Sequence, residues 1–97
     1  MFDPFNILGR WKLTSEKSDE LLRFLGDGTY CVYFQNPFRM IEIGNWSIRN
    51  GDLIMLASNV ELSSSIIYLD AKLLSLNYPY ENEKKVLHTY AKLDELF

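Results

Sequence analysis

The stretch EIGNWSIRNGDLIML, residues 42–56, decides the fold class of this chain. Two apolar runs flank Asn50-Gly51, and this dipeptide is a strong signal for a β-hairpin because a type I′ turn needs a positive φ at both central residues. The stretch also carries Gly44-Asn45-Trp46, and a second Gly-x-Trp segment lies at residues 9–11. We expect each segment to begin a strand, with the glycine permitting close backbone approach and the tryptophan filling the core.

Gly, Pro, Asn and Asp residues divide the rest of the chain into short apolar runs, as is typical of an antiparallel sandwich or barrel. The segment 15–26 is ambiguous, because Ser18 suits a helix cap whereas the alternation of Leu22 and Phe24 favours a strand in its second half. We favour the strand. The expected strands are residues 8–15, 20–25, 29–35, 39–49, 52–58, 64–70, 72–78 and 85–93.

The 97 residues suit a single domain over positions 1–97. A hydrophobic share of 47% and a charged share of 24% are those of an ordinary soluble globular domain. Cys31 is the only cysteine, so no intrachain disulfide can form. The N-terminus has an acid at Asp3 and no basic region before an apolar run, and no run is long enough for a membrane span. We therefore expect a cytoplasmic protein.

The net charge of −3 arises in the C-terminal half of the chain. Residues 1–50 contain six acids and six bases, whereas residues 51–97 contain seven acids and four lysines. Because the chain has no basic stripe to displace counterions from a phosphate backbone, we do not expect nucleic acid as a partner. An acidic surface is better suited to a basic protein partner.

The run DPFNILGRW, residues 3–11, is similar to the opening of lipocalin-like barrels, in which a one-turn helix plugs the bottom and the Trp enters the first strand. Three further motifs extend this resemblance to the small lipocalin-like, calycin-type domains of bacteria over most of the chain. They are Leu22-x-Phe24, Asp27-Gly28-Thr29-Tyr30, and Gly44-Asn45-Trp46-x-Ile48 leading to Gly51-Asp52-Leu53. The resemblance implies an all-β fold: one eight-stranded antiparallel up-and-down barrel, or a flattened barrel or sandwich, with a short N-terminal helical turn.

The resemblance also bears on the interior. Lipocalins place an arginine of the last strand against the first-strand Trp, and the corresponding run VLHTYAKL offers Lys92. A barrel of eight strands encloses room for its own side chains or for one small ligand. Because the expected strands are short and rich in aromatic residues, we expect side chains to fill the interior. The residues expected in the core, or around a ligand, are Trp11, Phe24, Tyr30, Trp46, Tyr68 and Tyr90.

No group of residues predicts catalysis or a metal site. His88 has no Cys or His at ligand spacing, and Cys31 lies in an apolar run without a basic neighbour in the sequence to lower its pKa. Glu81 and Glu83 lie in the charged loop PYENEKK, which is typical of a solvated turn. We therefore expect no enzyme, no catalytic residue, no bound metal and no cofactor.

Most expected strands are apolar on both faces, so something covers part of the outer face. With the acidic C-terminal half, this predicts a non-enzymatic protein-binding module, of the kind formed by immunity-type inhibitors that neutralise a basic partner such as a nuclease toxin. A homodimer would cover the same face. The alternative is a binder of an apolar small molecule, such as a fatty acid, in the barrel interior. The partner-binding residues expected are Asp52, Glu61, Asp70, Tyr78, Tyr80, Glu81 and Glu83.

Overall fold

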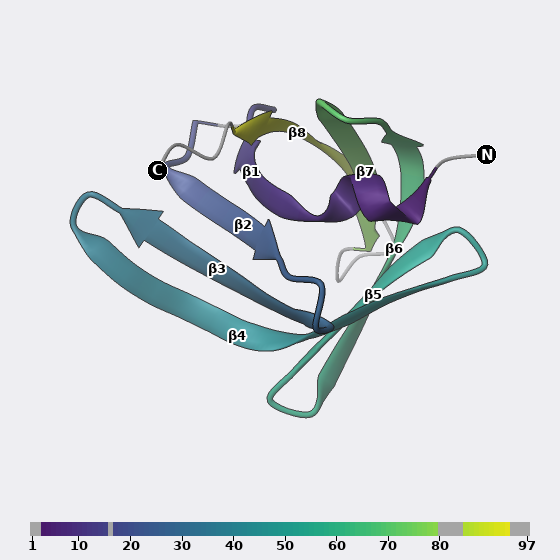
Figure 1. The fold of residues 1–97 in the computed structure, drawn as a ribbon, viewed down its shortest axis with the longest axis horizontal. Coiled ribbons are helices and arrows are strands. Elements are labelled where there is room, and N and C mark those ends of the chain that lie inside the picture. Colours follow the sequence, from purple (N-terminus) through teal and green to yellow (C-terminus); the bar gives the residue numbers. More distant parts are fainter. Residues whose placement is uncertain (1–2, 16, 80–84, 94–97) are drawn as a thin grey trace.

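The computed structural model describes residues 3–15, 17–79 and 85–93, and it forms one closed antiparallel barrel in which each strand pairs with the next and β8 returns to β1 (Figure 1). This confirms the predicted eight-stranded up-and-down barrel and its N-terminal helical turn. No helix within the described part of the chain has the length and apolar character needed to cross a membrane. The elements are a 3-10 helix η1 (Pro4–Ile7) and the strands β1 (Gly9–Leu13), β2 (Glu20–Phe24), β3 (Thr29–Gln35), β4 (Phe38–Arg49), β5 (Asp52–Ala57), β6 (Val60–Leu69), β7 (Leu73–Pro79) and β8 (Lys85–Leu93).

The turns explain why the strand prediction succeeds and where it is inaccurate. Asn50 and Gly51 have φ values of 53° and 80°, as the predicted type I′ turn requires. Within its described residues, 15 and 17–26, this segment contains β2 and no helix, which confirms the strand. β6 begins at Val60, earlier than predicted, because Ser58 and Asn59 form a second tight turn with φ values of 50° and 63°. Such φ values are uncommon for residues other than glycine, although Asn tolerates them best.

The N-terminal turn closes one end of the barrel. Asp3 caps η1 by accepting a hydrogen bond from the backbone N–H of Phe5 at 2.9 Å. Ile7, the last residue of η1, is fully buried, and its carbonyl accepts a hydrogen bond of 2.8 Å from the indole N–H of Trp11. The first strand is therefore joined to the plug that precedes it.

Lys92 joins the last strand to the same plug. Its ammonium group donates hydrogen bonds to the carbonyls of Asn6 at 2.6 Å and Leu8 at 2.7 Å, and lies 4.7 Å from the centroid of the Trp11 ring. Both hydrogen bonds are charge-assisted and therefore stronger than bonds between neutral groups. The ammonium group is also attracted to the face of the Trp11 ring. One side chain thus connects β8, β1 and the residues of η1.

Large side chains fill the half of the barrel next to η1. Phe24 packs edge-to-face against Trp46 with a centroid distance of 5.6 Å, and the Trp46 indole donates to the carbonyl of Leu25 at 2.9 Å. The buried positions confirm Trp11, Phe24, Tyr30 and Tyr90 as core residues, with Trp46 half-buried beside them. The core cluster consists of Ile7, Trp11, Leu13, Leu22, Phe24, Tyr30, Leu53, Met55, Leu69, Leu74, Leu76 and Tyr90.

Tyr68 is the one predicted core residue that the structure places outside. Its side chain is 49% exposed, and its hydroxyl donates to Asp70 at 2.6 Å on the surface. The cause is a register shift in β6 between Ile66 and Tyr68, where Ile67 is an extra residue without a partner on β7. A bulge reverses which alternate residues face inward, so Leu69 enters the core in place of Tyr68.

Candidate functional site

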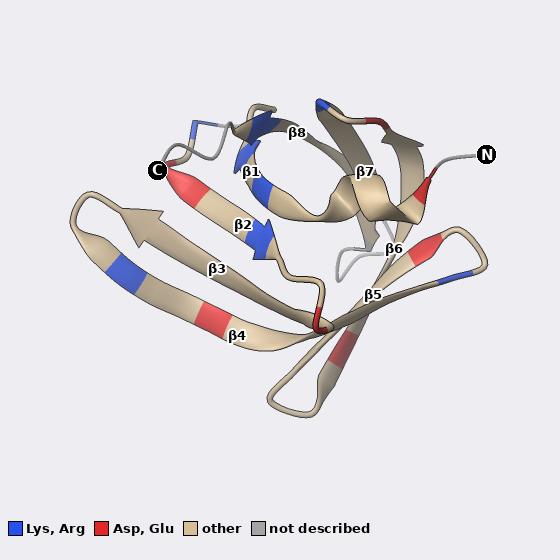
Figure 2. Cartoon of the chain, in the orientation of Figure 1, with Lys and Arg blue, Asp and Glu red and all other residues tan. Residues whose placement is uncertain are grey.

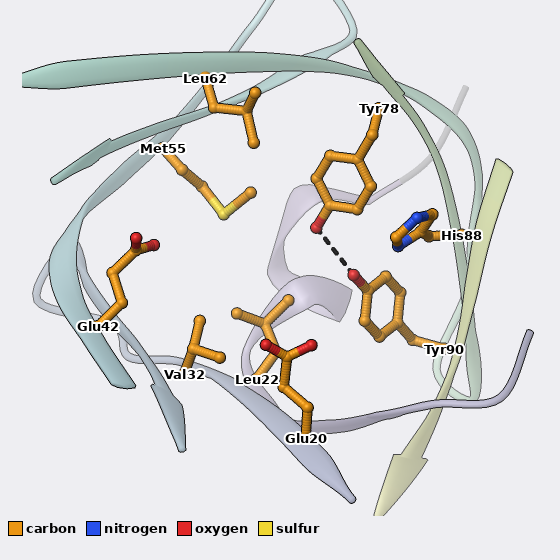
Figure 3. Close-up of a pocket in the computed structure, with 9 residues that line it drawn as sticks. All are labelled: Glu20, Leu22, Val32, Glu42, Met55, Leu62, Tyr78, His88 and Tyr90. Carbon is orange, nitrogen blue, oxygen red and sulfur yellow. Dashed lines mark hydrogen bonds between the residues drawn. The ribbon is translucent and has the colours of Figure 1, made fainter. Parts of the chain in front are cut away.

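A cavity of about 310 Å³ occupies the half of the barrel farther from η1 and is partly open to solvent (Figure 3). Every strand from β2 to β8 contributes to its wall. The wall is more apolar than polar, with a small number of carboxylates, hydroxyls and an imidazole among aliphatic side chains. The lining residues are Glu20, Leu22, Val32, Glu42, Met55, Leu62, Tyr78, His88 and Tyr90.

The register of the sheet brings these side chains to one face. Leu22 lies opposite Val32 on β3, and Val32 lies opposite Glu42 on β4. Directly opposed residues of antiparallel strands point to the same face of the sheet, so all three face the interior. In Figure 3 the ribbon of η1 lies behind the lining side chains, which agrees with its position at the closed end.

The Glu42 carboxylate is held at the cavity wall by a hydrogen bond from a core residue. Its Oε2 accepts a hydrogen bond of 2.6 Å from the hydroxyl of Tyr30, which is 2% exposed. Burial raises the pKa of the Tyr30 hydroxyl, and the hydrogen bond to Glu42 raises it further, so Tyr30 keeps its proton as the donor. A buried core residue thus holds the Glu42 carboxylate in one orientation at the wall of the cavity.

Three aromatic residues of β7 and β8 form the opposite wall. The hydroxyls of Tyr78 and Tyr90 hydrogen-bond to each other at 2.8 Å, and the His88 ring lies edge-on to Tyr78 with a centroid distance of 4.4 Å. The register places Leu76 opposite His88 and Leu74 opposite Tyr90. Because both leucines are buried in the core, both aromatic residues of β8 also face the interior. This wall combines flat aromatic surface with the hydrogen-bonding groups of two hydroxyls and an imidazole.

The cavity corrects the prediction that side chains fill the whole interior. The prediction is right for the end next to η1, where Trp11, Phe24 and Tyr30 are fully buried. It is wrong for the other end, where the inward positions include Glu20 and Glu42. Charged side chains cannot pack into a dry core at small energetic cost, so space remains around them.

The structure separates the predicted partner-binding residues. Asp52 follows the β4–β5 turn and Asp70 the end of β6, both at the η1 end of the barrel, whereas Glu61 lies at the start of β6 at the opposite end. Tyr78, expected to bind a partner, lines the cavity inside the barrel. Figure 2 likewise shows acidic residues distributed over several strands and turns. Tyr80, Glu81 and Glu83 lie outside the described residues.

Asp70 has a structural role that accounts for its position. Besides accepting from Tyr68, its carboxylate accepts from the backbone N–H groups of Lys72 and Leu73, each at 2.8 Å. The hydrogen bond from Tyr68 is the largest of the effects that lower the pKa of Asp70, followed by those two backbone donors. Asp70 therefore organises the turn between β6 and β7.

Cys31 lies on the outer face of β3, directly opposite Arg23 of β2. Cys31 has no basic neighbour along the chain, but the pairing of β2 with β3 brings Arg23 beside it. Burial nevertheless outweighs the charge of Arg23, so the pKa of the Cys31 thiol is raised. A thiol with a raised pKa is a poor nucleophile. Within the described part of the chain, no three His, Cys, Asp or Glu side chains are grouped in a way that would hold a metal ion.

Glu20, Glu42 and His88 line the cavity although none of them was expected from the sequence to line a site. Their positions follow from alternation: Glu20 is two residues before inward Leu22, and His88 two residues before inward Tyr90. Glu42 is four residues before Trp46 on the same alternating face of β4, so strict alternation from the expected core residues could have placed all three inward.

Comparison with known proteins gives no assignment for this barrel. No protein-family model, no curated protein and no solved structure matches the chain. The functional conclusion therefore depends on the geometry of the barrel and its cavity.

Proposed function

We propose that this protein binds a small organic molecule in the open half of the barrel. The observation that supports this is the cavity of about 310 Å³, whose mainly apolar wall carries a few converging polar groups. Small-molecule sites in proteins have this composition and volumes of roughly 300–1,000 Å³. Cavities in the mouths of β-barrels are among the places where such sites occur most often.

The volume limits the size of the ligand. A dry apolar cavity of roughly 150 Å³ holds one benzene molecule. By proportion, the present cavity accepts a ligand of about a dozen non-hydrogen atoms. A longer molecule would extend beyond the cavity into solvent.

The lipocalin-like resemblance supports the same proposal. The η1 turn and the buried Trp11 agree with that resemblance, and Lys92 lies over the Trp11 ring, which in lipocalins an arginine of the last strand covers. Together they close one end of the barrel and leave the other end for a ligand. We therefore propose a lipocalin-like relationship at the level of the fold.

Filling the cavity is expected to abolish binding. Val32→Trp adds an indole to the cavity wall, whereas Val60→Trp adds the same group at a position that is 67% exposed. We expect 2-naphthol, a neutral fluorescent probe of suitable size, to bind the wild type and Val60→Trp and to lose at least about tenfold in affinity for Val32→Trp, because the indole takes its place. Fluorescence titration measures this, and circular dichroism checks that both variants fold. Equal affinity in both variants would place the probe elsewhere and contradict the proposal.

A second candidate is the protein-binding module that the sequence predicts, including an inhibitor of a basic protein. The observation that favours it is the outer face of β4, where Phe38, Met40, Ile41 and Ile43 are 66%, 41%, 47% and 65% exposed. A register shift between β3 and β4 leaves Ile41 without a partner, so Met40 and Ile43 both remain outside. Exposed apolar patches of this kind are typical of protein interfaces.

This second candidate predicts that Ile43→Asp abolishes capture of a partner from native cell lysate, while Val60→Asp, at an equally exposed valine on β6, retains it. A charge in the centre of an apolar interface costs binding energy because it is desolvated without a partner. Mass spectrometry of captured proteins is the measurement. Light scattering of the purified protein tests for a homodimer through the same face. Capture that is unaffected by Ile43→Asp would exclude β4 as the interface.

A further inference from the structure

We infer that the ligand of the cavity carries a positive charge, as a protonated amine joined to a small apolar body. This inference rests on the proposed function and specifies the chemical class of the molecule bound. The described lining residues include two carboxylates, Glu20 and Glu42, and no lysine or arginine. The site therefore presents negative charge to its contents, next to a mainly apolar wall.

The orientation of Glu42 suits it to bind a cation. One carboxylate oxygen accepts the hydrogen bond from Tyr30, and this bond fixes the group at the cavity wall. A carboxylate offers about four lone-pair sites, so further acceptor capacity is present on the same group. An ammonium ligand with three N–H donors matches that capacity, and charge-assisted hydrogen bonds of this kind are roughly twice as strong as neutral ones.

The aromatic wall favours the same class of ligand. Tyr78 and Tyr90 are linked through their hydroxyls, so their rings stay in fixed positions beside the cavity. The face of an aromatic ring attracts cations, and sites for organic ammonium groups commonly use such rings. The rings also provide flat apolar surface for the uncharged part of the ligand.

The remaining wall requires the cation to be organic. Leu22, Val32, Met55 and Leu62 line the cavity with aliphatic groups that a hydrated inorganic ion would not contact favourably. The carboxylates in turn disfavour an anion such as a fatty acid, because like charges within a partly enclosed site repel each other. The aliphatic wall can therefore contact the uncharged part of a neutral or a cationic ligand. The carboxylates are what should make the affinity for the cation higher.

A matched series of ligands tests this inference: 2-phenylethylamine, 2-phenylethanol and phenylacetate share one ring and differ in the charge of the polar group. Isothermal titration calorimetry at pH 7 and low ionic strength measures the affinity of each. We expect the amine to bind about three- to fivefold more tightly than the alcohol, because Glu42 is exposed and an ion pair open to solvent contributes only modestly. We expect the carboxylate to bind more weakly than the alcohol. Added salt reduces the advantage of the amine.

Two isosteric variants assign the effect to the cavity. Glu42→Gln keeps an oxygen that can accept from Tyr30 and removes the charge, so the amine is expected to lose about three- to fivefold in affinity while the alcohol is unaffected. Glu61→Gln removes an exposed charge on β6 outside the cavity wall and is expected to change neither affinity.

The outcomes separate this inference from the proposed function. If the alcohol binds as tightly as the amine and Val32→Trp weakens both, the cavity is a ligand site but the positive charge of the ligand is excluded. If Glu61→Gln lowers the affinity of the amine as much as Glu42→Gln, the charge preference belongs to the whole surface and the inference is wrong. If neither 2-naphthol nor any of the three compounds binds, both the proposed small-molecule site and the inference about ligand charge are wrong.

Discussion

Replacing Trp11 with alanine is expected to lower the free energy of unfolding by about 3–5 kcal/mol. Trp11 is fully buried, and its indole N–H donates to the carbonyl of Ile7 while Lys92 lies over its ring. The change removes the largest buried side chain, leaves a cavity beside η1 and deprives that carbonyl of its donor. Three contributions therefore act in the same direction.

Urea unfolding followed by circular dichroism measures this loss. A domain of this size has a total stability of roughly 5–15 kcal/mol, so the variant is expected to melt more than about 10 °C below the wild type or to fail to fold. Phe5→Ala provides the control, because Phe5 belongs to the same N-terminal turn but is 77% exposed. It is expected to change stability by less than about 0.5 kcal/mol. If the two variants were equally stable, the η1 end would not be the packed end of the barrel.

The strands could be predicted from sequence because their limits are set locally. The turn at Asn50-Gly51 needs only the two residues whose φ is positive, and these residue types are recognisable without any tertiary contact. The turn at Ser58 and Asn59 has the same geometry with a less typical pair, and there the predicted boundary of β6 is inaccurate. Turn chemistry therefore accounts for both the success and the error.

The site could not be predicted because it depends on register over long distances. The same dependence explains the error at Tyr68, which was expected in the core. Its outward position depends on a bulge at Ile67, and a single sequence does not reveal such a bulge when both neighbours are apolar. The cavity depends on Glu20 and Glu42 facing inward from different strands of a closed barrel. Alternation along each strand can place each acid on the inward face, but only barrel closure brings the two together around one space.

Gly44→Ala is expected to destabilise the barrel by about 3 kcal/mol or more, because a side chain at this position has no space to occupy. A Cβ on Gly44 would overlap the backbone carbonyl of Leu56 and would lie 2.8 Å from Cε1 of Tyr30. The carbonyl belongs to β5, which pairs with β4 next to this point, so it cannot move without disturbing the ladder. Glycine is needed here so that two strands and the Tyr30 ring can approach closely.

Gly26→Ala is the matched control for this prediction. Gly26 is exposed in the β2–β3 connection, and its nearest neighbour would be Leu8 Cδ1 at 4.0 Å from the added Cβ, which is an ordinary contact. Urea unfolding is expected to show a change below about 0.5 kcal/mol for Gly26→Ala and the large loss for Gly44→Ala. A loss for Gly44→Ala as small as that for Gly26→Ala would mean that β4 and β5 can separate at Gly44 and would contradict the prediction. An added Cβ at Gly44 would also displace the Tyr30 ring in any variant that still folds. Because the Tyr30 hydroxyl holds the Glu42 carboxylate, that displacement would alter the wall of the cavity.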